Sequence, residues 1–168
     1  MQSGTPPSES ERLVLEPLRV EHADELVPVL ADPALYTVIG GEPPSLDRLR
    51  ERYRAQLAGS GDPGERWFNW VIRLRDGAAA VGYVQATVTD NGRAADVAWV
   101  LGTAWQGHGY AAEAAGRMAQ ALAEAGVTTL TAHIHPEHPA SAAVARRIGL
   151  RPTGRLDDDG EQVWEGDA

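Results

Sequence analysis

The sequence of 168 residues contains no cysteine. That absence excludes disulfide bonds, thiolate metal ligands and a cysteine-bound acyl intermediate. It also fits a reducing compartment, so we expect a cytoplasmic protein. Long apolar runs are missing too, since no stretch approaches the ~20 residues of a membrane-spanning helix. The N-terminal residues lack the basic and apolar regions of a secretory signal, and we expect neither export nor a membrane partner.

Basic residues are also scarce, with 15 Lys and Arg against 24 Asp and Glu, which makes the net charge −9. This balance argues against a nucleic-acid backbone as the main partner, and it suits either solubility or a cationic substrate. Phenylalanine occurs once, but there are five tryptophans and four tyrosines. Large aromatic side chains in strands usually belong to the core, although one of "WFNW" could face a substrate pocket. Length and composition together indicate one globular domain.

The spacing of apolar residues predicts a single mixed α/β domain over residues 11–168, preceded by a disordered arm over residues 1–10. Ser45 is expected to cap its helix and Gly59 to end it, while Pro28 interrupts the first helical pattern. The predicted helices cover residues 21–32, 45–59, 109–126 and 141–149. The predicted strands cover residues 12–20, 66–76, 80–90, 94–101, 127–135, 150–156 and 161–166, and the second to fourth form an antiparallel meander.

The stretch "WQGHGYA" (residues 105–111) joins a predicted strand to the longest predicted helix. The first N–H groups of a helix have no partner within it, and the helix dipole favours negative charge there. Gly107 and Gly109 carry no side chain, so an anion could approach the backbone closely. A plain connection that uses glycine for its geometry explains the pattern equally well. The spacing is not that of a P-loop.

"QGHGYA" resembles the Q/R-x-x-G-x-G/A motif of the GNAT superfamily of N-acetyltransferases. "ERLVLEPLRVEHADELVPVLADP" is similar to the first strand and helix of the branch that includes the ribosomal-protein N-terminal (alanine/serine) acetyltransferases. "ADVAWVLGTAWQGHGYAAEA" resembles the central strand, turn and helix of that branch. "HPEHPASAAVARRIGLRPTG" looks like its last conserved block, where N-x-A-S and K-x-G-F are usual. The resemblance spans about residues 11 to 165 and carries three motifs in order.

The resemblance implies the acyl-CoA N-acyltransferase fold, a mostly antiparallel sheet flanked by helices, with residues 96–101 and 129–135 on two splayed central strands. Acetyl-CoA would be the cosubstrate, and its pantetheine arm would pair with the backbone of Trp99, Val100 and Leu101. An amide near Val100 would polarise the thioester carbonyl. The pyrophosphate would bind the amides of six consecutive residues: Gln106, Gly107, His108, Gly109, Tyr110 and Ala111.

The chain departs from the family at two positions. Many members place a tyrosine general acid where this sequence has Ala145, so no tyrosine acid is expected. His138 replaces the usual asparagine, and it could still donate a hydrogen bond to the pantetheine. Ser141 could donate to the departing sulfur or cap the helix at residues 141–149, and the two roles are compatible.

Two residues are candidates for the catalytic base. Asp96 occupies the start of the central strand, where relatives often carry glutamate, and it shares a face with Ala98 and Val100. His133 lies five residues before His138, where some relatives place a carboxylate, and histidine titrates near neutral pH. Either side chain could also be an ordinary strand residue. The histidines of "HIHPEH" could suggest a metal site, but ordinary loop and strand positions explain them better, and we expect no metal.

The expected function is an acetyl-CoA-dependent N-acetyltransferase in which a primary amine attacks the thioester directly. The acceptor would be a protein N-terminal α-amine, a small cationic amine such as an aminoglycoside or a polyamine, or an amino-acid metabolite. An α-amine (pKa ~7.7–8.0) needs a base less than a lysine-type amine (pKa ~10.4). The alternatives are a non-catalytic acyl-CoA-binding or regulatory domain and an N-acyltransferase for a longer acyl chain. We expect a monomer or homodimer, with residues 157–159 forming a solvated hairpin turn.

Overall fold

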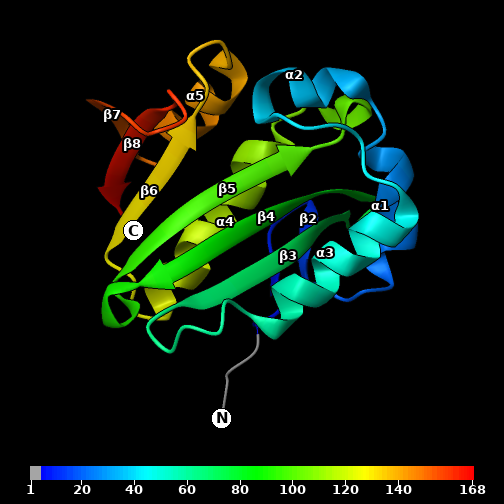
Figure 1. Ribbon diagram of the computed structural model, residues 1–168, viewed down its shortest axis with the longest axis horizontal. Coiled ribbons are helices and arrows are strands. Elements are labelled where there is room, and N and C mark those ends of the chain that lie inside the picture. The colour runs from blue at the N-terminus through cyan, green and yellow to red at the C-terminus, as the bar shows by residue number, and fades with distance from the viewer. Residues whose placement is uncertain (1–4) are drawn as a thin grey trace.

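The computed structural model describes residues 5–168, which fold into one open sheet with helices on both faces (Figure 1). The helices are α1 (His22–Val29), α2 (Tyr36–Ile39), α3 (Leu46–Ala58), α4 (Tyr110–Glu124) and α5 (Pro139–Arg147). The strands are β1 (Ser8–Glu9), β2 (Leu13–Pro17), β3 (Arg66–Leu74), β4 (Ala80–Thr89), β5 (Ala94–Leu101), β6 (Thr129–Ile134), β7 (Arg151–Leu156) and β8 (Gln162–Asp167).

The eight strands lie in the order β1-β2-β3-β4-β5-β6-β8-β7. Every pair of neighbours is antiparallel except β5 and β6, which are parallel because α4 connects them across the sheet. The prediction of a mixed, mostly antiparallel α/β domain is therefore confirmed. None of the described helices has both the length and the apolarity needed to cross a bilayer.

Two apolar clusters cover the two faces of the sheet. In Figure 1, α4 lies behind the sheet, while α1 and α3 lie in front of it. The larger cluster fills the space under α4 and includes Trp70, Met118 and Trp164, each nearly inaccessible to solvent. The smaller cluster lies under α1 and α3 and includes Leu26 and Leu49. The aromatic stretch of β3 thus contributes mainly to the core, as its residue types predict.

Most predicted elements are confirmed, with shifted ends. Ser45 caps α3 as expected, since its hydroxyl accepts the N–H of Arg48 at 3.2 Å. The prediction of α5 needs correction, because the helix begins at Pro139 and His138 holds the N-cap position. Proline suits the first turn of a helix, where its missing N–H would have no partner. Ser141 therefore lies inside the first turn and does not cap the helix.

The predicted disordered arm does not fit residues 5–10. Ser8 and Glu9 form β1 and pair with Leu15 and Val14 of β2. The indole N–H of Trp70 also donates to the carbonyl of Pro6 at 2.7 Å, so this segment covers the edge of the core. Residues 1–4 of the predicted arm lie outside the described residues.

A buried ionic network links β2, α1 and β3. Arg73 donates to both Glu16 and Glu25, and the fully buried His22 contacts Glu16 through Nε2. His22 Nδ1 accepts the N–H of Arg19 at 2.9 Å, so the ring donates from Nε2. Hydrogen bonding from Arg73, supported by His22 and opposed by burial, lowers the pKa of Glu16 to about 2. Glu16 therefore stabilises the fold in its ionised form.

We expect Glu16→Gln to lower the free energy of unfolding by about 2 kcal/mol at pH 7, because the variant leaves the partly buried Arg73 with one carboxylate fewer. The stabilisation is complete above the ordinary pKa of a glutamate, about 4.3, and is lost as the pH falls toward 2. Urea unfolding of both proteins at several pH values measures this difference. Glu51→Gln on the exposed side of α3 is the control, and a difference that persisted unchanged down to pH 2 would contradict the assignment.

Candidate functional site

The two central strands are paired at one end only. Parallel pairing of β5 and β6 covers three residue pairs and ends at Asp96 opposite Thr131. Beyond that point, residues 97–101 pair only with β4, and residues 132–134 pair only with β8, among the described strands. The strands diverge as each follows its other neighbour, which confirms the expected splayed centre of the fold (Figure 1).

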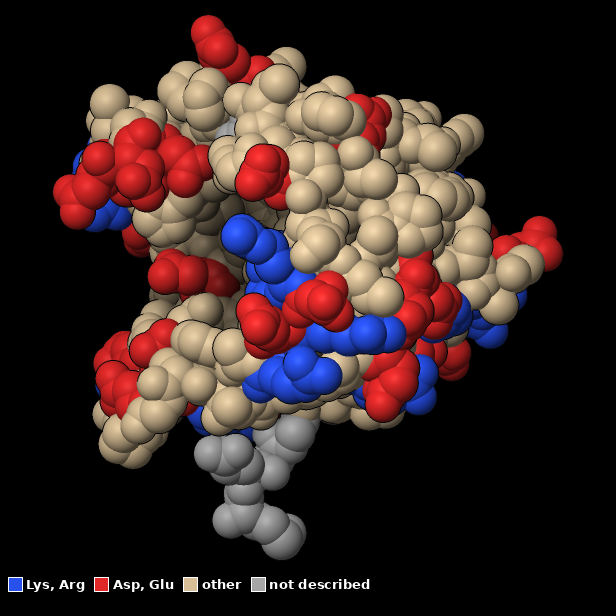
Figure 2. All heavy atoms as spheres, turned by 45° about the vertical axis from the view of Figure 1, so that its right-hand side comes forward, with Lys and Arg blue, Asp and Glu red and all other residues tan. Residues whose placement is uncertain are grey.

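A cavity of about 600 Å³ occupies this divergence. Its floor is one face of the sheet, where Tyr83 lies opposite Val100 and Gln85 lies opposite Ala98. One wall comes from β6, α5 and the β7–β8 hairpin, and includes His133, His138, Ser141 and Glu161. The other wall comes from α2, α3 and their connection, and includes Arg48 and Arg52. Figure 2 shows the hollow in the molecular surface.

Alternation along β5 decides which of its predicted residues reach the cavity. The side chains of Ala98 and Val100 form part of the cavity floor. Trp99 packs its side chain against the core under α4 and lines the cavity with its backbone. Asp96 lies on the same face as Ala98, opposite Thr87, and is exposed. Among the described residues that line the cavity, Asp96 does not occur. Of the two candidate bases, His133 therefore lines the cavity and Asp96 does not.

Successive residues of a strand direct their backbone N–H and C=O groups to opposite sides, and this alternation decides which amides of β5 face the gap. The N–H of Gly102 donates to Val81 of β4 at 2.8 Å, so even-numbered residues of β5 direct their polar groups toward β4. The carbonyl of Arg93 accepts the N–H of Thr129 at 3.1 Å, which shows the same parity at the paired end. The amides that face β6 are consequently those of Trp99 and Leu101, which flank Val100, and the sequence predicted an oxyanion donor near that residue.

The glycine turn leaves a row of N–H groups free. Gly107 and Gly109 have φ of +87° and +80°, in the left-handed region that glycine adopts without strain. The N–H of Gln106 donates to Thr103 and that of Glu113 donates to Gly109. Within residues 5–168, no recorded hydrogen bond uses an N–H of residues 107–111. Five amides at the start of α4 are thus free to bind an anion.

Gln106 has a different role from the five amides that follow it. Its own N–H is already bonded within the turn, at 3.3 Å from the Thr103 carbonyl. Its side-chain amide donates to the carbonyl of Leu101 at 3.1 Å, which ties the turn to the end of β5. Gln106 therefore positions the turn, and its backbone is not part of the free row.

Arg12, from the start of the chain, supports the same turn. Its Nη1 donates to the carbonyl of His108 at 2.9 Å, its Nε pairs with Glu113 at 2.7 Å, and its guanidinium lies 4.6 Å from the ring centre of Tyr110. The arginine brings a positive charge beside the free amides. No local sequence pattern indicates this contact, because only the fold brings the segment before β2 beside the start of α4.

His133 is oriented by a carboxylate of the β7–β8 hairpin. Its Nδ1 lies 2.9 Å from Asp157 Oδ2. The N–H of Glu161, together with His133 and the N–H of Asp159, holds the pKa of Asp157 below its ordinary value despite some burial. Because an ionised carboxylate only accepts, Nδ1 of His133 donates and Nε2 is left free to take a proton. This is the arrangement that a general base requires.

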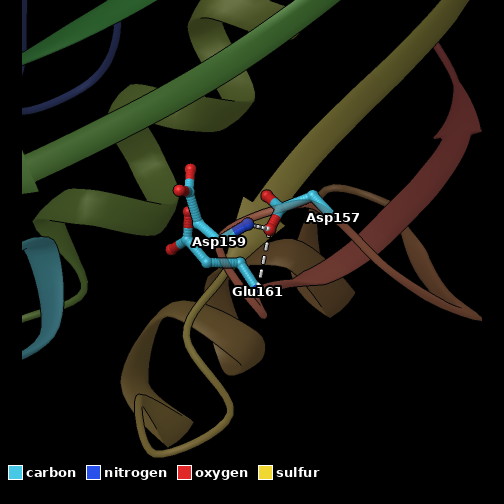
Figure 3. Close-up of side chains that lie close together, drawn as sticks. All are labelled: Asp157, Asp159 and Glu161. Carbon is cyan, nitrogen blue, oxygen red and sulfur yellow. Dashed lines mark hydrogen bonds between the residues drawn. The ribbon is translucent and has the colours of Figure 1, made fainter.

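Glu161 is a cavity residue that sequence reasoning missed, because it was predicted as the first residue of the strand over residues 161–166. Burial and the nearby charge of Asp157 raise the pKa of Glu161. Figure 3 shows its side chain beside Asp157 and Asp159, with one oxygen of each within 4.8 Å of the others. Asp157 Oδ1 already accepts the N–H groups of Asp159 and Glu161, each at 2.9 Å, which shapes the turn.

The three histidines of residues 133–138 do not gather around a common point. His135 Nδ1 accepts the N–H of Glu137 at 3.0 Å, and burial together with His135 lowers the pKa of His138. In the described part of the chain, the carboxylates in Figure 3 are the group with metal-ligand spacing. The absence of a metal stays a prediction. Ala145, at the position of the family tyrosine, is fully buried.

Comparisons with known proteins agree with this architecture. A family model described as an acetyltransferase (GNAT) domain matches residues 12–151. The chain therefore belongs to the GNAT family of acetyltransferases and is an N-acetyltransferase. A comparison with curated proteins found no match.

Solved structures resemble the chain over nearly its whole length. An acetyltransferase from Agrobacterium tumefaciens is 26% identical, with a TM-score of 0.74 over 99% of this chain and 96% of that one. RimL, a ribosomal L7/L12 α-N-protein acetyltransferase in complex with coenzyme A, is 17% identical, with a TM-score of 0.81 and 97% of both chains covered. The aminoglycoside acetyltransferase AAC(6')-Ib, in complex with coenzyme A, is 15% identical, with a TM-score of 0.76 over 92% of this chain and 94% of that one.

Proposed function

We propose that this protein transfers an acetyl group from acetyl-CoA to a primary amine by direct attack within a ternary complex. The observation that carries the proposal is the row of five free amides, residues 107–111, at the start of the helix that follows the diverging strand. Coenzyme A in the structures of RimL and AAC(6')-Ib supports the choice of cosubstrate. The lack of cysteine excludes a cysteine-bound acyl intermediate and so favours direct attack.

The backbone supplies most of the groups that would hold acetyl-CoA. The free amides of residues 107–111 suit the diphosphate, and Arg12 adds a positive charge beside them. The amides of Trp99 and Leu101 face the gap, where one of them would bind the thioester carbonyl as an oxyanion donor does. His138 and Ser141, on the opposite wall, would bind the pantetheine.

The reaction needs one proton acceptor and is helped by one donor. His133 Nε2 takes the proton that converts the bound ammonium group into a neutral amine. The amine nitrogen then forms a bond to the carbonyl carbon, the bond from that carbon to sulfur breaks, and a second proton from the nitrogen passes to the departing thiolate, which leaves as free thiol. Glu161 would hold the incoming ammonium group before it loses its proton. Ser141 would donate a hydrogen bond to the departing thiolate, a modest aid because a thiol has a pKa of ~8.5.

The acceptor would be an α-amine or a small amine. RimL acts on a protein α-amine and AAC(6')-Ib on an aminoglycoside, so both kinds occur among the similar folds. An α-amine of pKa ~7.7–8.0 is partly neutral at pH 7 and asks less of the base. We further propose a cytoplasmic protein that acts as a monomer or homodimer, with the catalytic domain spanning residues 11–168.

We expect His133→Ala to lower kcat about a hundredfold, which is within the usual contribution of a general base. Glu161→Gln should mainly raise the KM of the amine, because it removes the charge that attracts the ammonium group. Release of free thiol with a panel of amines at pH 6 to 9 measures both effects. Asp96→Asn is the control, and an Asp96→Asn enzyme as impaired as His133→Ala would show that the base lies at Asp96 instead.

Binding of acetyl-CoA without thiol release on any amine would favour a non-catalytic domain, whereas release only with longer acyl-CoAs would favour a different donor.

We expect Arg12→Gln to raise the Kd of coenzyme A about tenfold, because the variant removes a charge and a bond that supports the turn. Isothermal titration calorimetry with coenzyme A measures this change. Arg117→Gln on α4, which breaks a partly exposed ion pair with Glu124, should leave the Kd within about twofold. Equal changes in the Kd of coenzyme A for the two variants would show that Arg12 does not contribute to diphosphate binding.

A further inference from the structure

The cavity has two chemically different walls, and the wall formed by α3 is rich in hydrogen-bond donors. Arg48 and Arg52 lie four residues apart on one face of α3, and both line the cavity. Neither has an acidic partner within 4.0 Å among the described residues, whereas Arg50, between them in sequence, pairs with Asp24 at 2.9 Å. In Figure 2 the basic side chains near the hollow gather on one side of it, while acidic side chains lie on its opposite side and also next to the basic ones. In a protein of net charge −9, two arginines at a cavity without a carboxylate partner are free to meet an anion.

The floor next to Arg52 adds neutral donors. Tyr83 and Gln85 of β4 line the cavity beside it, and burial, partly offset by the charge of Arg52, raises the pKa of Tyr83 to about 12. The Tyr83 hydroxyl thus stays protonated and can donate. Tyr53 lies behind Arg52, only 4% exposed, and its hydroxyl has no hydrogen-bond partner among the described residues. A buried hydroxyl without a partner is rare and indicates a group that a ligand or water satisfies.

A small pocket lined in part by Tyr53 shares lining residues with the main cavity. It holds about 20 Å³, room for roughly one water molecule. Arg52, Tyr83 and Gln85 line both this pocket and the main cavity, and Tyr53 lines the small pocket. The α3 wall and the adjoining floor therefore present guanidinium, phenol and amide donors to one region, and Glu42 is the carboxylate of the cavity lining described on that side. A group with several acceptor oxygens suits these donors, and the two guanidinium charges favour one that is an anion.

The opposite wall has the reverse character. Glu161 lines the cavity from the β7–β8 connection and His133 lines it from β6, and Asp157 contacts His133. A carboxylate and a neutral imidazole suit an ammonium group that must lose a proton. The end of the cavity near the gap between β5 and β6 therefore suits a cation, and the end at α3, the anionic pole of the site, suits an anion.

We propose that the acceptor is a small zwitterion of the amino-acid type, whose amine lies at Glu161 and His133 and whose anionic group binds Arg52 and Arg48. The inference rests on the proposed function and narrows its acceptor. It disfavours polyamines and aminoglycosides, because a second cationic group at α3 would meet two arginines. A carboxylate and a phosphonate both satisfy the donors, since each offers several oxygen acceptors and a negative charge.

The test compares acceptors that differ only in the anionic group. Amino carboxylates of increasing chain length, the matching aminoalkylphosphonates and the matching amino alcohols have similar amine pKa values when the chain is long. Thiol release from acetyl-CoA measures kcat/KM for each acceptor, with spermidine as the polycation. We expect the best amino carboxylate or phosphonate to exceed its amino alcohol at least about tenfold, the size of one charge-assisted hydrogen bond. The ratio of kcat/KM between the amino carboxylates and the matching aminoalkylphosphonates then identifies the preferred anionic group.

Variants of α3 test the assignment of the anionic pole. We expect Arg52→Gln to reduce the ratio of kcat/KM between the amino carboxylate and the amino alcohol about tenfold, and Arg52→Lys to restore part of it. Arg54→Gln is the matched control, because Arg54 is exposed on the same helix and lies outside both lining sets among the described residues. It should leave the ratio within about twofold.

The possible outcomes separate this inference from the proposed function. Three results would overturn the proposal of a zwitterionic acceptor while leaving the proposed acetyltransferase activity intact. They are equal kcat/KM for amino alcohols and amino carboxylates, a higher kcat/KM for spermidine, or a kcat/KM ratio that Arg52→Gln does not change. Absence of thiol release with every amine would overturn the proposed function. In that case, calorimetry of the amino carboxylates with the coenzyme A complex of the wild type and of Arg52→Gln decides the inference alone, since equal affinities would overturn it.

Discussion

The loss of hydrogen bonding between β5 and β6 after their third residue pair is the constraint on which the rest of the site depends. β5 is hydrogen-bonded to β4 along its length, and β6 is hydrogen-bonded to β8 in the same way. The two strands therefore cannot pair further with each other without breaking these longer ladders. The odd-numbered residues of β5 are left with polar backbone groups that face a cavity. Unpaired backbone groups at such a place cost free energy unless a ligand or water satisfies them, which makes the gap a natural binding site.

Main-chain groups dominate both ends of this site. The amides of residues 107–111 and the exposed edge of β5 depend on backbone geometry, and few side chains are needed beyond Gln106 and Arg12 to support them. Such a site tolerates extensive sequence change, which agrees with folds that superimpose closely at 15–26% identity. The walls around the acceptor are built from side chains, so they are where members of the family can differ in substrate.

The elements with strong local patterns were predictable from the sequence. The meander of β3, β4 and β5, the helix α4 and its glycine turn follow from alternation, helical periodicity and residues that need a left-handed backbone. The start of α5 was misplaced by two residues, because Ser141 is a better capping residue by type than His138, while Pro139 fits the first turn. β1 was missed because two residues carry no periodicity, and its stability comes from pairing with β2.

The sequence by itself determined the family, the mixed sheet and the place of the glycine turn before α4, since these follow from motifs and periods within short stretches. Tertiary structure alone decided which side chains share the cavity. It brought Arg12 to the turn from about a hundred residues away, turned Glu161 from a hairpin residue into a lining residue, excluded Asp96 from the lining, and set Arg48 and Arg52 across from His133. The reason is physical: local patterns determine the conformation of a segment, whereas its neighbours depend on how the sheet pairs and how the helices pack on it.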